Sequence, residues 1–213
     1  MLQLIRKDLM VLFNRWNVIF LLLSSSFMVF VSNTTIPQGQ YLFIASTIAF
    51  FVSTSSFAYD ELSQSEFIIQ SLPVTRKEIV FAKYVGIIIN NLIGIFYTTL
   101  VFLSLSLLGL REKDFLQMDI IISTVFIVIF MTSICFPLYF KIGYRKAKIV
   151  NILVFMSFFM VMNALIDDLD KTKSMLLLLF EIPYLHIIIP LAILTMAMLS
   201  MVLSLKLYTK KDL

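Results

Sequence analysis

The sequence DELSQSEFIIQSLPVTRKEIVFAKY occupies residues 60–84 and separates two long apolar runs. Thr75 is followed three residues later by Glu78, which is the spacing of a capping box at a helix N-terminus. Pro73 disfavours helical structure in the residue that precedes it. The stretch therefore predicts a short helix over residues 60–72, a turn around Pro73, and a much longer helix that begins just after Thr75.

Composition places the flanking runs, and most of the chain, in a membrane. Of the 213 residues, 60% are hydrophobic and only 14% are charged, whereas soluble domains are about 45–50% apolar and 25% charged. A transmembrane helix needs about 20 apolar residues. The sequence therefore predicts an all-α integral membrane protein, a single transmembrane domain over residues 1–213 with six transmembrane helices. The predicted spans are 17–32, 41–58, 80–110, 119–140, 149–166 and 182–207.

The 17 lysines and arginines divide unevenly between the two sides that six spans create. Cytoplasmic loops carry an excess of these residues, so the richer side is predicted to be cytoplasmic. Both termini and the 60–72 helix then lie in the cytoplasm, and the protein is predicted to be a multi-pass protein of the cell membrane. The richer side holds Arg6, Lys7, Arg15, Arg76, Lys77, Lys83, Lys141, Arg145, Lys146, Lys148, Lys206, Lys210 and Lys211, and the other side holds Arg111, Lys113, Lys171 and Lys173.

Two further segments are predicted to be helices that do not cross the bilayer. Residues 1–16 carry apolar side chains at helical spacing, with polar ones such as Lys7 opposite, which favours an amphipathic helix in the inner membrane surface. Arg6 and Lys7 belong to this interfacial helix. Residues 167–183 form the predicted outer loop, and their apolar run 175–180 is too short to span the bilayer. This run predicts a short outer re-entrant helix that leans on the bundle.

Residues that perform covalent or redox chemistry are scarce, so the chain is not predicted to be an enzyme. Cys135 is the only cysteine and His186 the only histidine, which excludes an intrachain disulfide, a cysteine metal cluster and a bis-histidine metal or haem site. No glycine begins or ends a phosphate-binding loop, so nucleotide energy must come from a partner. Dispersed basic residues argue against nucleic acid, and the lack of charged residues near the span centres argues against ion-coupled transport.

The loop and the topology together resemble the ABC-2 type transporter permeases, the membrane subunits of one class of ATP-binding-cassette exporter. The amphipathic start LQLIRKDLMVLF is similar to that family, as is the acidic helix followed by Ser-Leu-Pro, a small hydroxyl residue, Arg and a Lys-Tyr pair. These motif residues are Ser71, Leu72, Pro73, Thr75, Arg76, Lys83 and Tyr84.

The resemblance implies that residues 60–72 form a coupling helix seated on a separate ABC ATPase subunit, near the N-terminal amphipathic helix. ATP and Mg would be bound by that partner, with no cofactor in this chain. The residues implied to couple to the ATPase are Asp60, Glu61, Leu62, Glu66, Phe67, Leu72, Pro73 and Arg76.

The same resemblance implies a dimer with a second copy or a related permease, because one six-span subunit is half of a pathway. Among small permeases the chain looks most like exporters of amphipathic cytolytic peptides of the phenol-soluble modulin type. The expected function is export of an apolar or amphipathic substrate, such as a cytolytic or antimicrobial peptide, along a pathway whose residues the sequence does not identify. The alternative is a non-transporting membrane protein that gives immunity to, or binds, a toxic peptide without an ATPase.

Overall fold

A computed structural model describes residues 2–12, 37–63, 75–109, 117–167 and 185–210, and the regular structure in these ranges is entirely helical. This confirms the predicted all-α class. The helices are α1 (Leu2–Leu12), α3 (Pro37–Leu62), α5 (Arg76–Leu107), α6 (Met118–Ile142), α7 (Tyr144–Asp167) and α9 (Leu185–Thr209).

Four of these helices are long and apolar enough to cross a membrane: Gln38–Leu62, Arg76–Leu107, Met118–Ile142 and Ile187–Thr209. They correspond to the second, third, fourth and sixth predicted spans. α7 is helical over the fifth predicted span, 149–166, and the first, 17–32, lies outside the described residues. The total of six spans stays a prediction.

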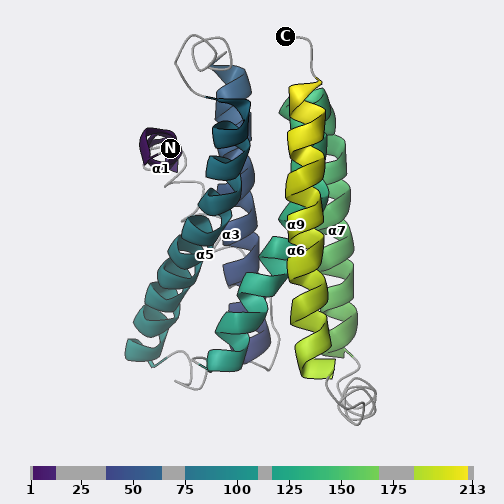
Figure 1. Ribbon diagram of the computed structural model, residues 1–213. Coiled ribbons are helices and arrows are strands. Elements are labelled where there is room, and N and C mark those ends of the chain that lie inside the picture. Colours follow the sequence, from purple (N-terminus) through teal and green to yellow (C-terminus); the bar gives the residue numbers. More distant parts are fainter. Residues whose placement is uncertain (1, 13–36, 64–74, 110–116, 168–184, 211–213) are drawn as a thin grey trace.

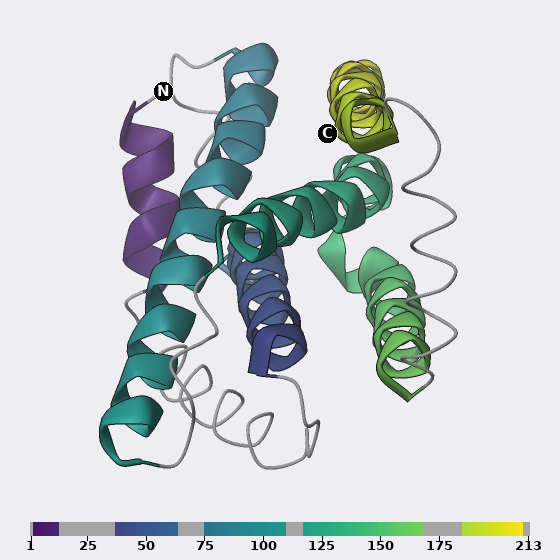
Figure 2. The same ribbon diagram turned by 90° about the horizontal axis from the view of Figure 1, so that it is seen from below.

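The long helices form a bundle in which α3 and α6 are central (Figure 1). α3 packs against α5, α6 and α7, while α6 also packs against α5, α7 and α9. In the apolar window of α3, 78% of the residues are buried, against 11% in that of α9. Figure 2 shows α6 between the α3–α5 side and the α7–α9 side. Among the described helices that could span a membrane, α9 is therefore the least buried.

The start of α5 agrees with the sequence. Thr75 is its N-cap, and the Thr75 backbone N–H donates to Glu78 Oε2 at 2.8 Å. The Glu78 backbone N–H donates in return to Thr75 Oγ1 at 3.3 Å. Both halves of the predicted capping box are present, because each bond joins residues only three positions apart and needs no tertiary contact.

The end of α3 differs from the expectation of a separate helix that begins at residue 60. α3 continues without a break to Leu62, and the Ser63 N–H still donates to the Tyr59 carbonyl at 2.9 Å. No glycine or proline lies in residues 58–63, so nothing in the local sequence ends the helix there. Asp60, Glu61 and Leu62 are therefore the last turn of α3.

Gly94 sets how closely α3 and α5 approach. A Cβ atom at Gly94 would lie 2.9 Å from Ala49 Cβ and 3.2 Å from the Ala45 carbonyl oxygen, whereas at Gly86, also in α5, it would meet nothing within 4 Å.

We expect the Gly94→Ala substitution to lower the stability of the bundle by about 1–3 kcal/mol through overpacking between α3 and α5. The measurement is the midpoint of thermal unfolding in detergent, which should fall. Gly86→Ala is the matched control, and equal midpoints for the two variants would contradict the assignment.

Candidate functional site

One end of the bundle gathers segments that are far apart in the sequence. α3 ends there, α5 begins there, α6 turns into α7 there, and α9 ends there (Figure 1). α1 also lies beside α3 and α5. These segments were all predicted to lie on the side of the membrane that is richer in lysine and arginine. In the structure they lie at a common end of the bundle.

A set of four charged side chains joins α1 to the ends of α3 and α5, and we call it the ion-pair cluster: Lys7, Asp8, Asp60 and Lys83. Lys83 Nζ lies 3.0 Å from Asp8 Oδ2 and 2.7 Å from Asp60 Oδ2, and it donates to Ser56 Oγ at 2.9 Å. Lys7 Nζ pairs with Asp60 Oδ1 and lies 3.5 Å from Asp8 Oδ1. The Lys83 side chain is only 8% exposed. Two cations and two carboxylates balance one another, which is the condition for keeping charges at a buried site.

Aromatic side chains support the cluster from inside the bundle. Lys83 Nζ lies 4.8 Å from the centre of the Phe57 ring, a distance at which a cation is attracted to the ring face. Phe57 packs in turn on Phe136 and Phe140 of α6, with ring centres 4.9 and 5.2 Å apart. The cluster is therefore continuous with the core between α3 and α6.

Glu61 connects the end of α3 to the start of α7. Glu61 Oε2 accepts a hydrogen bond from the Arg145 backbone N–H at 2.8 Å, and Arg145 Nε lies 3.7 Å from Glu61 Oε1. Gly143, with φ of +82°, permits this approach, because a Cβ there would lie 3.2 Å from Glu61 Oε2. A carboxylate at this position satisfies a free N–H and complements the positive end of the α7 dipole.

Arg76 connects the start of α5 to the end of α9. Its guanidinium donates to the carbonyl oxygens of Tyr208 at 3.2 Å and Thr209 at 2.9 Å. It also lies 6.0 Å from the centre of the Tyr208 ring. These carbonyls belong to the last turn of α9, where backbone acceptors lack helical partners and a cation is favourable.

A second contact between α5 and α9 lies deeper in the bundle. The Tyr84 hydroxyl is within 2.7 Å of Ser200 Oγ and 2.9 Å of Ser204 Oγ. Ser200 Oγ also donates to the Ser133 carbonyl of α6 at 2.7 Å. In a membrane such hydroxyls need protein partners, so this chain of bonds holds α9 against α5 and α6.

The structure brings together those predicted site residues that it describes. Asp60 and Glu61 bind other helices, whereas Leu62 beside them is 70% exposed. Arg6 is exposed on α1, while Lys7, predicted on the helix side away from the apolar stripe, faces the bundle. The predicted coupling residues Glu66, Phe67, Leu72 and Pro73 and the outer run 175–180 lie outside the described residues.

The sequence prediction missed the pairing of Asp8 with Lys83. A signal for it was present, because Lys83 lies two turns inside the helix that Thr75 starts, where a lysine next to an apolar span needs a partner. Asp8 was also the only carboxylate near the basic N-terminus.

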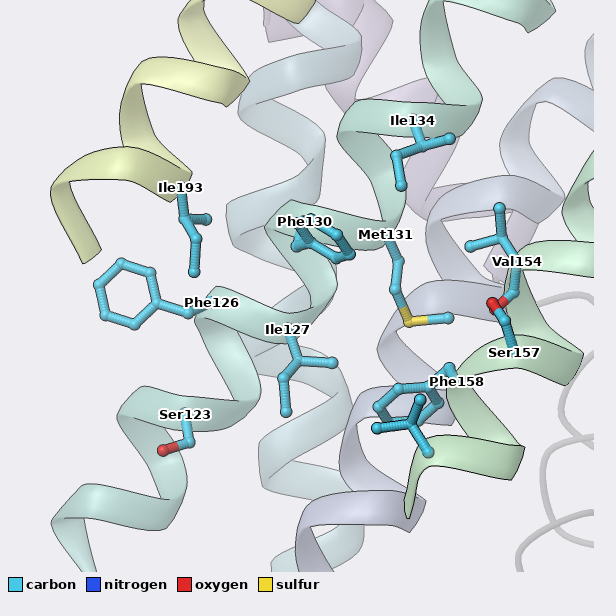
Figure 3. A pocket seen from close by; sticks show the side chains of 11 residues that line it. Ser123, Phe126, Ile127, Phe130, Met131, Ile134, Val154, Ser157, Phe158 and Ile193 are labelled. Carbon is cyan, nitrogen blue, oxygen red and sulfur yellow. The ribbon is translucent and has the colours of Figure 1, made fainter. Parts of the chain in front are cut away.

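An apolar groove of about 550 Å³ lies between α6 and α7 and extends to Ile193 of α9 (Figure 3). Phe126, Phe130 and Met131 of α6 and Phe158 of α7 contribute to its walls. None of the described residues that line it is charged, and the hydroxyls of Ser123 and Ser157 donate to carbonyl oxygens of their own helices. Such a groove suits a hydrocarbon-rich ligand, because its described walls are mainly hydrocarbon.

A model of one known protein family matches the chain over nearly all of its length. The model of the ABC-2 family transporter proteins matches residues 3–209. No curated protein and no solved structure matches the chain. A match over nearly the full length, together with apolar helices long enough to span a bilayer, identifies a multi-pass membrane protein. The chain belongs to the ABC-2 family of transporter proteins.

Proposed function

We propose that the chain is the membrane permease subunit of an ABC exporter and that a separate ABC ATPase engages the end of the bundle that carries the ion-pair cluster. Membership of the ABC-2 family implies such an ATPase partner and a role in membrane transport, and permeases of this family are generally not catalytic themselves. In this proposal the ATPase binds ATP and Mg, and this end of the bundle and both chain termini are cytoplasmic.

The observation that carries the proposal is the set of bonds at the start of the predicted coupling segment, residues 60–72, and just after its end. Asp60, at its start, binds α1 and α5, and Glu61 binds α7. Arg76, just after it, binds the last turn of α9. A partner that displaces this segment would therefore act on four other helices through direct polar bonds.

Leu62 supports a protein contact at this place. It follows the two bonded carboxylates, and it is 70% exposed at the end of α3. An exposed leucine beside fixed charges is suited to a small apolar contact with a polar rim. The coupling role of Glu66, Phe67, Leu72 and Pro73 remains part of the proposal.

The proposed substrate is apolar or amphipathic, and a cytolytic or antimicrobial peptide is the preferred class. The apolar groove between α6 and α7 supports this choice, because the described residues that line it offer mainly hydrocarbon contacts and carry no charge. The proposed pathway forms between two permeases, either two copies of this chain or this chain and a related one. The low burial of α9 among the described helices is compatible with such a pair.

The test is ATP hydrolysis by the chain co-expressed with an ABC ATPase from the same organism, reconstituted in lipid nanodiscs with and without an amphipathic helical peptide. We expect the two proteins to co-purify and the peptide to change the hydrolysis rate. Failure to retain any ATPase would contradict the proposal and favour the immunity or peptide-binding alternative.

Leu62→Asp gives a sharper version of the same test. We expect this variant to fold normally, since the side chain is exposed, and to lose at least about tenfold in ATPase affinity through the lost apolar contact and the added charge. Leu107→Asp is the matched control, because Leu107 is 83% exposed at the opposite end of α5. Equal ATPase retention by both variants would place the contact elsewhere.

A further inference from the structure

The corner between α6 and α7 carries four exposed cations within eight residues. Lys141 lies in the last turn of α6, and Arg145, Lys146 and Lys148 lie at the start of α7. The Arg145 side chain is 76% exposed. In the part of the chain that the structure describes, the one carboxylate paired with this group is Glu61, at 3.7 Å from Arg145. We call these four residues the basic corner.

Three other cations at the same end of the bundle are engaged in the fold. Lys7 and Lys83 bind carboxylates, and Arg76 binds the carbonyls of α9. In the basic corner, Arg145 alone has a carboxylate partner among the described residues, and Arg145, Lys146 and Lys148 lie at the start of α7. Cations there face the positive end of the helix dipole, which costs helix stability instead of adding to it, and the first turn of α7 has no acidic residue.

Along one face of α7, the exposed side chains change from cationic at the start of the helix to apolar further along it. Arg145, Ile149, Ile152 and Met156 follow one another at spacings of three and four residues, so they share one face of the helix. Ile149 is 69% exposed, Ile152 52% and Met156 47%. The face therefore offers positive charge at the edge of the bundle and a hydrocarbon surface along the predicted fifth span.

We infer that this face binds an anionic phospholipid, with the phosphate headgroup on the basic corner and an acyl chain along Ile149, Ile152 and Met156. Charge complementarity selects the anionic headgroup, since juxtamembrane clusters of lysine and arginine attract anionic lipid. Continuity of the cationic and apolar surfaces on one helix selects a lipid over a soluble acidic protein. The inference does not depend on the transport proposal, because it rests on α6 and α7 alone.

The test compares lipid retention by purified protein in detergent, using native mass spectrometry after incubation with phosphatidylglycerol or phosphatidylcholine of the same acyl chains. The test variant is Lys141→Gln/Lys146→Gln/Lys148→Gln, which leaves Arg145 and its Glu61 contact in place. We expect wild type to prefer phosphatidylglycerol and the variant to lose that preference roughly tenfold or more, since each such cation contributes on the order of a fivefold effect.

A matched control removes the same amount of charge at the same end of the bundle. Lys77→Gln/Lys206→Gln/Lys210→Gln changes three exposed lysines on α5 and at the end of α9, and it is expected to keep the preference. The arginine variant Lys141→Arg/Lys146→Arg/Lys148→Arg should also keep it. Equal loss in the two glutamine variants would show a net-charge effect only and would overturn the inference.

Two further arms separate the competing ligands. Soluble glycerol phosphate at the same concentration should not protect the protein from thermal unfolding as phosphatidylglycerol does, and equal protection would indicate a phosphate site without an acyl chain. If the test variant keeps the lipid but no longer retains the ATPase, the basic corner is a protein contact and the lipid assignment is wrong.

Discussion

Lys83→Met is expected to lower the stability of the bundle by about 3 kcal/mol, because it leaves two carboxylates with one cation at a largely buried site. Lys83 is 8% exposed, and its partners Asp8 and Asp60 are 15% and 13% exposed. Methionine has a similar length and fits the Phe57 contact, so the change removes charge more than volume. The measurement is the thermal unfolding midpoint in detergent, together with the accessibility of α1 to protease.

A second substitution checks that the effect is electrostatic. Lys83→Met/Asp8→Asn leaves Lys7 with Asp60, one cation and one carboxylate, and we expect it to recover part of the lost stability. Lys83→Arg keeps the charge and is expected to lose less than Lys83→Met. If Lys83→Met unfolds at the wild-type midpoint, the ion-pair cluster does not hold α1 on the bundle.

Glu61→Lys is expected to abolish peptide-dependent stimulation of ATP hydrolysis, with a decrease of at least about tenfold, while the ATPase still co-purifies. The lysine removes the acceptor for the Arg145 N–H and brings a cation to Arg145 and to the positive end of α7. The bond that links the end of α3 to α7 is then lost, and motion of the coupling segment no longer reaches that helix. Nanodisc hydrolysis assays with and without the peptide measure this effect.

Glu61→Gln is the control for this prediction. Its amide oxygen still accepts the Arg145 N–H, so we expect most of the stimulation to remain. Full stimulation in Glu61→Lys would mean that the contact between Glu61 and α7 has no part in coupling. Loss of ATPase binding in Glu61→Lys would instead assign Glu61 to the contact with the partner.

The sequence located this region of the protein but did not predict the bonds that its charged residues make within the chain. Asp60, Glu61 and Arg76 were expected to contact an ATPase, and the structure gives each of them bonds within the chain. Lys7 was expected on the side of α1 away from its apolar stripe, yet it faces the bundle. The reason is that a charged group with a buried counter-ion can point inward, which hydrophobic periodicity alone does not register.

The sequence by itself determined the membrane environment, the helical class and the start of α5. Apolar run length and composition are properties of the chain alone, and the capping box joins Thr75 and Glu78 over three residues. Only the tertiary structure decided that Lys83 meets Asp8 and that Glu61 meets Arg145, residues 75 and 84 positions apart. Such pairs depend on which helix ends the packing of the whole bundle brings together, and no local pattern carries that information.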